Sequence, residues 1–301
     1  MRRVRGFHIA VGCLVSLAIN KMKYMYKAMS NCFIVSRDTG AMGSRPRISV
    51  CMATYNGERY IEEQLRSILA QLTDTDEVVI VDDDSSDQTR TLIGEFRDPR
   101  IRLFLNDDNC GVLVSFEKAI LNSSGDILLL SDQDDVWKPE KVATIFQVFA
   151  NNPEIMVIQT DSSIIDEAGQ CVADSYYSTR SKFTTSLIGN LVHFRYQGCG
   201  MAFRREIFPE IFPFPHGFDV LHDLWIGLRT TISGHEILYL DSKLFQYRRH
   251  SSNASYTLPR RRQIKVRLHL MASLLVDGAR RCMCRIANSL GMGEQTNKYD
   301  S

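Results

Sequence analysis

The chain has 301 residues, of which 44% are hydrophobic and 9% aromatic, which suffices for a buried core in one large domain or two small ones. Its net charge of +1 hides an uneven distribution, because residues 1–47 hold nine Lys/Arg against one acid and residues 259–301 hold nine against three. The remaining 48–258 hold 18 basic and 31 acidic residues, a net of −13. An acidic body between basic ends argues against nucleic-acid binding, since its central surface would repel phosphate backbones. It fits a body that binds a metal–diphosphate, and ends that either contact anionic lipid or only aid solubility.

The first 46 residues differ in pattern from the rest. An apolar run, Phe7–Ile19, is flanked by Lys and Arg and is too short to span a bilayer. It is compatible with a membrane-surface anchor, with an uncleaved signal-like segment, or with non-native sequence upstream of a true start at Met29 or Met42. We favour the last interpretation, because the patterned fold begins only at Arg47.

The cysteines show no spacing typical of zinc or redox sites, and no CxxC pair occurs among them. This usage predicts a reduced, cytosolic compartment. The eight are Cys13, Cys32, Cys51, Cys110, Cys171, Cys199, Cys282 and Cys284.

From Arg47 onward, strand-like apolar runs alternate with helical stripes. The predicted strands are 48–53, 77–81, 101–105 and 127–130, and each is followed by a predicted helix. This alternation predicts an α/β fold with a parallel sheet and helices on both faces. Right-handed crossovers would place the carboxyl ends of all four strands at one edge.

Polar turns follow these strands at that edge. The first is Thr54–Gly57, the second begins with Asp82, Asp83 and Asp84, and the fourth holds Asp132, Asp134 and Asp135. Ligands of open α/β sheets bind at this edge, and carboxylates crowded there need a cation. Oxygen ligands suit Mg²⁺ or Mn²⁺, which usually carry substrate phosphates. The alternative is an Asp-rich loop that caps the helix opened by Trp137, Lys138 and Pro139.

No phosphate-cradling glycine motif is present, since neither GxGxxG nor GxxxxGK[ST] occurs in the chain. The acidic turns therefore predict a nucleoside–diphosphate–metal site of another kind.

The second half is less regular. We expect strands at 155–159, 198–203 and 237–240, a polar Tyr-rich loop at 174–182 and a helix opening at 222–225. The prolines in 208–218 predict that this segment is not helical.

Three motifs in order, 48–57, 81–89 and 131–137, resemble the family 2 glycosyltransferases of GT-A fold, and the resemblance covers about residues 47–255. The variant Asp-Gln-Asp-Asp-Val-Trp is similar to the rhamnosyl- and hexosyltransferase branch of bacterial O-antigen and cell-surface polysaccharide synthesis. The resemblance implies a Rossmann-like, mostly parallel sheet with an irregular acceptor-side half. It also implies sugar transfer from a UDP- or dTDP-linked donor to a saccharide hydroxyl, with a lipid-diphosphate-linked acceptor.

Site residues can be carried over motif by motif. The resemblance implies Asp223, in the His222–Trp225 element, as the catalytic base, although an Asp at a helix start is often only a cap. It implies Asp134 and His250 as holders of Mn or Mg, His250 being otherwise a merely exposed side chain. The residues expected to contact the nucleotide sugar are Thr54, Tyr55, Asn56, Asp82, Asp83, Asp132 and Arg249.

Two departures from the family pattern stand in these motifs. Ala53 occupies a position where many relatives have Pro, and Asp84 one where Gly is usual. Neither removes a functional atom, but Asp84 adds charge near the nucleotide.

One base and in-line attack predict inversion at the anomeric carbon. The tail 256–301 contains a basic, amphipathic helical pattern that either lies on a membrane surface or packs on the catalytic domain. The first option would make the enzyme cytoplasmic and peripheral at the inner face of the bacterial inner membrane.

Two competing functions remain. A sugar nucleotidyltransferase would need a Gly/Arg/Lys-rich loop after the first strand, which Thr54–Glu58 lacks. A non-catalytic Mg²⁺-binding α/β module would leave the second-half motifs unexplained.

Overall fold

The computed structural model describes residues 45–179, 182–216, 220–251 and 253, and four isolated positions of the tail, 264, 267, 268 and 271. The chain divides into two compact units, Met1–Arg45 and Pro46–Ser301, and the description below concerns the second. The predicted N-terminal extension and most of the basic tail lie outside the described residues. Among the described residues, we find no helix with the length and apolar character that crossing a membrane requires.

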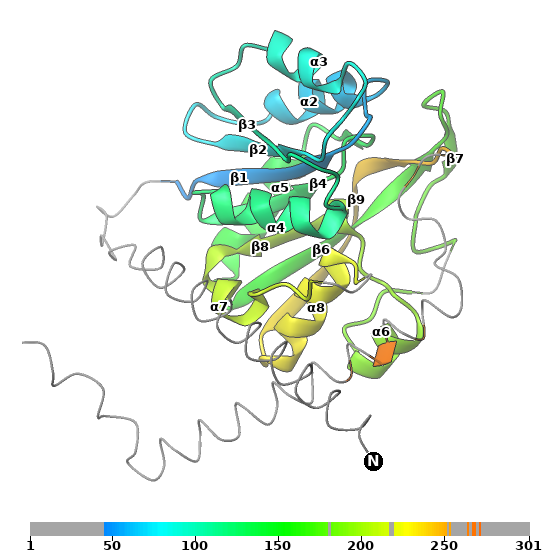
Figure 1. The fold of residues 1–301 in the computed structure, drawn as a ribbon. Helices are drawn as coiled ribbons and strands as arrows, with labels where there is room; N and C mark the ends of the chain where they lie inside the picture. Colours follow the sequence, from blue (N-terminus) through cyan, green and yellow to red (C-terminus); the bar gives the residue numbers. More distant parts are fainter. Residues whose placement is uncertain are drawn as a thin grey trace, which may run out of the picture. The chain divides into compact units, whose positions relative to one another are not determined.

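The first half of the unit is a βα alternation, as predicted (Figure 1). Its strands pair in parallel in the order β3-β2-β1-β4. The elements in chain order are β1 (Ile48–Thr54), α2 (Ile61–Leu69), β2 (Glu77–Asp82), α3 (Thr89–Glu95), β3 (Ile101–Leu105), α4 (Val112–Asn122) and β4 (Ile127–Ser131).

Burial on both faces explains why these strands are continuous apolar runs. Every residue of β2 and β4 is buried, and β1 has only one half-buried position. Strands covered by helices on both faces carry such runs instead of an alternating pattern. The helix α4 packs against β1 and β2, and α2 covers the opposite face, where Leu65 and Ile68 join the core (Figure 1).

The strand order contains a reversal that positions the site. The chain moves outward from β1 through β2 to β3, then returns through α4 to place β4 on the other side of β1. Ligands of open α/β sheets bind at such a switch point, in the crevice outside the carboxyl ends of the strands. The loops after β1 and β4 therefore flank the expected ligand position.

The second half extends the same sheet from β4 in the order β8-β6-β9-β5. The pairs β4–β8, β6–β8 and β5–β9 are antiparallel, whereas β6 and β9 run in parallel. Its elements are β5 (Val136–Trp137), α5 (Lys141–Asn151), β6 (Ile155–Ile165), β7 (Cys171–Ala173), α6 (Leu187–Val192), β8 (Met201–Arg204), α7 (Phe208–Ile211), α8 (His222–Ile232) and β9 (Glu236–Arg248).

Several local predictions in this half need revision. The strand expected at 198–203 begins only at Met201, after a 3-10 turn, and the strand expected at 155–159 continues to Ile165. A short helix, α7, does form at Phe208–Ile211, because Pro209 lies in its first turn, where a missing N–H costs nothing. Trp137 does not open a helix but pairs with Phe245 in a two-residue strand, and α5 begins only at Lys141. The strand expected at 237–240 extends to Arg248, since its second part pairs with β5 and β6.

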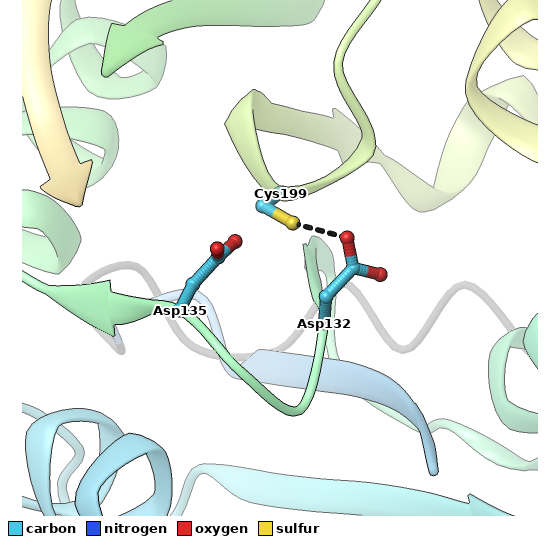
Figure 2. Close-up of side chains that lie close together, drawn as sticks. All are labelled: Asp132, Asp135 and Cys199. Atoms are coloured by element: carbon cyan, nitrogen blue, oxygen red, sulfur yellow. Dashed lines mark hydrogen bonds between the residues drawn. The ribbon is translucent and has the colours of Figure 1, made fainter. Parts of the chain in front are cut away.

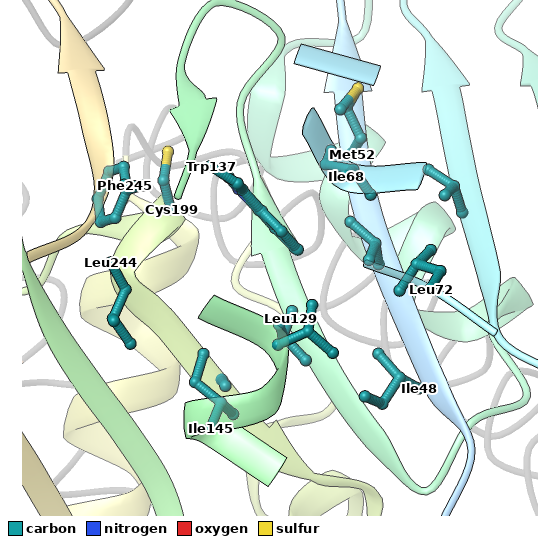
Figure 3. Close-up of a cluster of buried hydrophobic side chains, with 14 of the residues drawn as sticks. Ile48, Met52, Ile68, Leu72, Leu129, Trp137, Ile145, Cys199, Leu244 and Phe245 are labelled. Atoms are coloured by element: carbon teal, nitrogen blue, oxygen red, sulfur yellow. The ribbon is translucent and has the colours of Figure 1, made fainter. Parts of the chain in front are cut away.

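One hydrophobic core joins the two halves. Met52 of β1, Leu129 of β4, Trp137 of β5 and Phe245 of β9 belong to the same cluster of buried side chains (Figure 3). The aromatic pair at the β5–β9 end therefore anchors the acidic loop between β4 and β5 to the main sheet.

Gly125 offers a stability test of the close approach between β1 and the start of β4. A methyl group there would lie 2.6 Å from the backbone nitrogen of Ser49, which cannot move aside as a side chain can. We expect Gly125→Ala to lower the free energy of unfolding by about 1–3 kcal/mol, as overpacking does. Urea denaturation measures the change.

The matched control is Gly94→Ala in helix α3, where nothing lies within 4 Å of the added methyl. We expect this change to stabilise the protein by up to about 1 kcal/mol through helix propensity. Equal urea midpoints for the two variants would contradict the close packing at Gly125.

Candidate active site

The acidic loop 132–135 lies at the switch point, between β4 and β5. Its two ends are held by strand pairings, β4 with β1 and β5 with β9. Asp134 and Asp135 are buried, and Asp132 is half-buried. The fold therefore keeps three carboxylates at the carboxyl edge of the sheet, where the sequence places them.

Gln133 joins this loop to the turn after β1, a contact that sequence reasoning missed. Its amide pairs with the backbone of Tyr55 in both directions, accepting from the N–H at 2.9 Å and donating to the carbonyl at 3.0 Å. A Cβ at position 57 would lie 2.2 Å from Oε1 of Gln133, so any larger residue there would displace this amide. The two loops that flank the ligand position are thus one connected unit.

Asp82 is at the same edge, but its carboxylate is directed into the protein. It accepts hydrogen bonds from Thr54 Oγ1 at 3.0 Å, from the backbone N–H and Oγ of Ser85 at 2.9 and 2.6 Å, and from Arg90 Nε at 2.5 Å. Burial alone would raise its pKa, but donation by Ser85 and Arg90 outweighs burial and holds the pKa below its usual value. Thr54 and Asp82 therefore brace the turn.

Asp83 is engaged in the same way by the loop before α4. It accepts from Asn106 Nδ2 at 2.8 Å and from the backbone N–H groups of Cys110 and Gly111 at 2.9 and 2.8 Å. This carboxylate orders the loop that follows β3. If Asp83 also contacts the nucleotide, its carboxylate must accept that hydrogen bond in addition to the three internal ones.

Asp84 adopts a left-handed backbone conformation, with φ of 65°. This explains why Gly is usual at the position, and Asp is among the residues that best tolerate it. Its carboxylate pairs with Arg90 Nη2 at 3.1 Å, so Arg90 connects Asp82 and Asp84.

Of the predicted nucleotide contacts in the first turn, Tyr55 and Asn56 are exposed. The Tyr55 side chain is 48% exposed, an aromatic surface at the mouth of the switch point. The side-chain oxygen Oδ1 of Asn56 accepts from the backbone N–H of Ser86 at 2.9 Å, so it links the two polar turns.

Asp134 and His250 come together, although 116 positions separate them in sequence. Asp134 Oδ2 lies 2.8 Å from His250 Nε2, and Asn253 Nδ2 donates to the same oxygen at 3.1 Å. A carboxylate oxygen and an imidazole nitrogen thus lie side by side, and the carboxylate is the kind of ligand that both Mn²⁺ and Mg²⁺ prefer. The two residues predicted to hold the metal therefore fit that role.

Arg248, the residue before the predicted nucleotide-sugar contact Arg249, contacts the acidic loop. It is buried, its Nε donates to the Asp134 carbonyl at 2.9 Å, and its Nη2 pairs with Glu63 at 2.6 Å. Arg249 is exposed, and its backbone N–H donates to Ile165. The sequence-based prediction named Arg249 alone, whereas the end of strand β9 buries Arg248.

Asp132 and Asp135 gather around Cys199, which comes from the turn before β8 (Figure 2). The thiol of Cys199 donates to Asp132 Oδ2 at 2.7 Å. Burial, and then the charge of Asp134, raises the pKa of Asp132 to about 6, and the same causes hold the pKa of Asp135 well above its usual range. The expectation that all three carboxylates surround one centre is therefore replaced by two neighbouring clusters.

Lys141 lies behind this cluster and was not singled out by the sequence. Its side chain is 1% exposed, and Nζ donates to the Cys199 carbonyl at 2.6 Å between the rings of Trp137 and Phe245. Burial lowers its pKa to about 7. It ties the 3-10 turn Gly198–Gly200 to the start of α5.

Asp223 occupies the first turn of α8 and is buried. Its Oδ1 accepts from the Leu224 N–H at 2.7 Å, and the backbone of Gly198 also hydrogen-bonds to it. Burial, with a contribution from the charge of Asp132, raises the pKa of Asp223 to about 7. The turn Gly198–Gly200 therefore contacts both Asp223 and, through Cys199, the acidic loop.

His222 supports this turn from the other side. Its ring stacks on Phe116 with centroids 3.8 Å apart, and burial lowers its pKa to about 3. A Cβ at position 198 would lie 2.7 Å from its Nε2, so the glycine before Cys199 is required. His222 is thus a neutral packing residue beside the carboxylate.

Comparison with known proteins finds a matching sequence family and similar glycosyltransferases. The sequence model described as Glycosyl transferase family 2 matches residues 49–212. UDP-Glc:alpha-D-GlcNAc-diphosphoundecaprenol beta-1,3-glucosyltransferase WfgD of Escherichia coli is 30% identical over 186 residues, 60% of this chain and 69% of that protein. An uncharacterized glycosyltransferase of Nostoc sp. is 29% identical over 215 residues, 69% of this chain and 66% of that protein. The chain thus spans about two thirds of these curated relatives.

Solved structures share the fold. S. aureus TarS 1–349 in complex with UDP-GlcNAc superposes with a TM-score of 0.61 at 20% identity, covering 76% of this chain and 66% of that one. The mannosyltransferase PcManGT from Pyrobaculum calidifontis, in complex with GDP-Man and Mn²⁺, gives 0.53 at 18% identity, covering 83% and 70%. These likenesses confirm the predicted GT-A architecture.

Proposed function

Because the chain belongs to glycosyltransferase family 2 and such enzymes use nucleotide-sugar donors, we propose that it is an inverting hexosyl- or rhamnosyltransferase that uses a UDP- or dTDP-linked sugar. The observation that carries the proposal is the position of Asp223. It is a buried carboxylate that one turn, Gly198–Gly200, connects to the acidic loop at the switch point. One turn therefore connects the proposed base to the edge of the sheet where the diphosphate would bind. This arrangement suits a transfer by single displacement.

The donor lies at the carboxyl edge between the loops after β1 and β4. Tyr55, exposed there, offers a face on which the base stacks, and Asp132 is the half-buried acid of the loop after β4. Asp134 and His250 would hold Mn²⁺ or Mg²⁺, which supplies positive charge beside the leaving diphosphate when bound. Thr54, Asp82 and Asp83 shape the turns around the nucleoside, and Arg249 is the exposed cation at the rim.

The chemical step needs one proton acceptor. Asp223 takes the proton of the acceptor hydroxyl while its oxygen forms a bond to the anomeric carbon, and the bond from that carbon to the diphosphate oxygen breaks. The electron pair of the broken bond leaves with the nucleoside diphosphate. Attack from the face opposite to the leaving group inverts the configuration.

The acceptor class rests on one relative. The name of WfgD specifies a GlcNAc-diphosphoundecaprenol acceptor for that protein. We extend this chemistry to the present chain as a saccharide on a lipid diphosphate, in O-antigen or related polysaccharide synthesis. Such an acceptor would place the enzyme peripherally on the cytoplasmic face of the bacterial inner membrane.

A panel experiment tests the proposal. The full chain is incubated with Mn²⁺, UDP- and dTDP-sugars and a GlcNAc-diphosphate-lipid acceptor, and the product is followed by mass spectrometry. We expect one donor to yield an acceptor heavier by one sugar, with the anomeric configuration inverted by NMR. Binding of Mg²⁺ without transfer from any donor would favour the non-catalytic module instead.

The pH dependence of transfer follows from the base. Because the pKa of Asp223 is raised to about 7, the carboxylate is protonated below that pH and cannot accept a proton. We expect kcat/KM to fall about tenfold per pH unit below pH 7 and to level off above it. A profile that stays flat down to pH 5 would exclude Asp223 as the base.

A further inference from the structure

Three metal-ligating side chains gather beside the predicted Asp134–His250 position. Asp132 and Asp135 come from the acidic loop, and Cys199 comes from the 3-10 turn before β8. One donor atom from each lies within 4.8 Å of the other two (Figure 2). We name this group the thiol–carboxylate cluster.

Asp135 has a buried oxygen that points to a ligand. Its side chain is 0% exposed, and Oδ1 accepts from the backbone N–H of Arg248 at 3.0 Å, which fixes its orientation. Among the described residues, no hydrogen bond of normal geometry reaches Oδ2, and the Cys199 thiol beside it donates to Asp132. In Figure 2, the Asp135 carboxyl group is directed toward the sulfur. A buried, unpartnered carboxylate oxygen is costly and a cation would relieve that cost.

The donor set selects the kind of cation. Thiolate sulfur favours soft and borderline metals, whereas Mg²⁺ prefers carboxylates and water. Zn²⁺ accepts Cys sulfur at about 2.3 Å and carboxylate oxygen at about 2.0–2.2 Å in tetrahedral geometry, which puts neighbouring donors roughly 3.6 Å apart. The donor atoms of the cluster lie within 4.8 Å of one another, which is compatible with this spacing once Cys199 Sγ and Asp132 Oδ2, now 2.7 Å apart, separate slightly.

We propose that Cys199, Asp132 and Asp135 form a binding site for Zn²⁺-class ions, separate from the Asp134–His250 pair. On binding, the thiol and any protonated carboxyl group of the cluster release their protons to solvent. Sulfur and two carboxylate oxygens then coordinate the ion, and water completes the tetrahedron. Binding removes Asp132 from the donor site, so Zn²⁺ inhibits transfer. The inhibitory consequence rests on the proposed function, but the binding site does not.

Cadmium is the probe, because its bond to thiolate sulfur gives an ultraviolet charge-transfer band. The protein is the full chain in which the other cysteines except buried Cys51 are replaced by Ser: Cys13, Cys32, Cys110, Cys171, Cys282 and Cys284. We expect Cd²⁺ to produce a saturable band with one equivalent, and Zn²⁺ to displace it.

Three variants in this background decide the proposal, each checked for folding by circular dichroism. Cys199→Ser should abolish the band, whereas Cys51→Ser, the control, should keep it. Asp135→Asn, which leaves the thiol intact, should weaken Cd²⁺ binding by about 10–100-fold or more, since changes in the outer shell alone reach that range. A band that survives Cys199→Ser, or an unchanged Cd²⁺ affinity in Asp135→Asn, would overturn the site.

Transfer assays then test the inhibitory consequence separately. With saturating Mn²⁺, the Zn²⁺ concentration for half inhibition should rise at least about tenfold in Cys199→Ser relative to its background. Unchanged inhibition would refute that consequence. If no donor supports transfer, the proposed function fails while the cadmium band still decides the binding site.

Discussion

Asp223→Asn is expected to lower kcat by about 10²–10⁴-fold, the usual contribution of a positioned general base. Asn keeps the size of the side chain and can still accept the Leu224 N–H through its carbonyl, so the first turn of α8 should remain intact. What it loses is the ability to accept a proton from the acceptor hydroxyl. Single-turnover transfer measures the change, and equilibrium binding of the nucleoside diphosphate should stay within about twofold because only the base is altered.

The pH profile separates a base from a structural carboxylate. The residual activity of Asp223→Asn should lose the fall below pH 7, since the titrating group is gone. Asp107→Asn, on the exposed loop before α4, is the matched control and should keep both the rate and the profile. Full activity in Asp223→Asn would assign the proton transfer to another group.

Replacement of Asp134 by asparagine is expected to produce the second large effect, on metal binding. The new amide would still accept a hydrogen bond from Asn253 through its carbonyl, but it would lack the charge that attracts a divalent cation. Mn²⁺ affinity, measured by calorimetry in the presence of UDP, should fall by about 10–100-fold or more, and transfer should fall with it. High Mn²⁺ concentrations should restore part of the rate, because the chemical step itself is intact.

His250→Ala provides the independent partner test. His250 Nε2 lies on the same Asp134 oxygen, so its removal should also weaken Mn²⁺ binding, and the double variant should lose less than the sum of the two single losses. His235→Ala, at a half-buried position before β9, serves as the control. Unchanged Mn²⁺ affinity in both single variants would show that the metal is held elsewhere along the acidic loop.

Sequence reasoning treated the three acids of the loop 132–135 as one site, whereas the structure gives them different partners. Three acids within four positions indicate a crowded site but do not tell which way each side chain faces. In the structure, Asp134 faces His250 and Asn253, whereas Asp132 and Asp135 face Cys199. These partners come from two returning segments, the residues after β9 and the turn before β8.

What the sequence by itself determined is the parallel half and its polar edge. The buried runs of β1, β2 and β4 and the helical stripes between them are local patterns, and parallel strands bring their carboxyl ends together whatever the loops contain. The motif order then identified the family, which covers the same half and part of the next.

Only the tertiary structure decided the partners of that edge. The pairing of Trp137 with Phe245, the choice of Arg248 over Arg249, the Gln133–Tyr55 contact and the approach of Cys199 all join positions far apart in the chain. Such contacts leave no periodic trace, because they depend on strand register and on which side chains fit when distant segments pack. Local sequence pattern therefore predicts that the acids lie at the carboxyl edge of the sheet, and tertiary packing decides which residues each acid contacts.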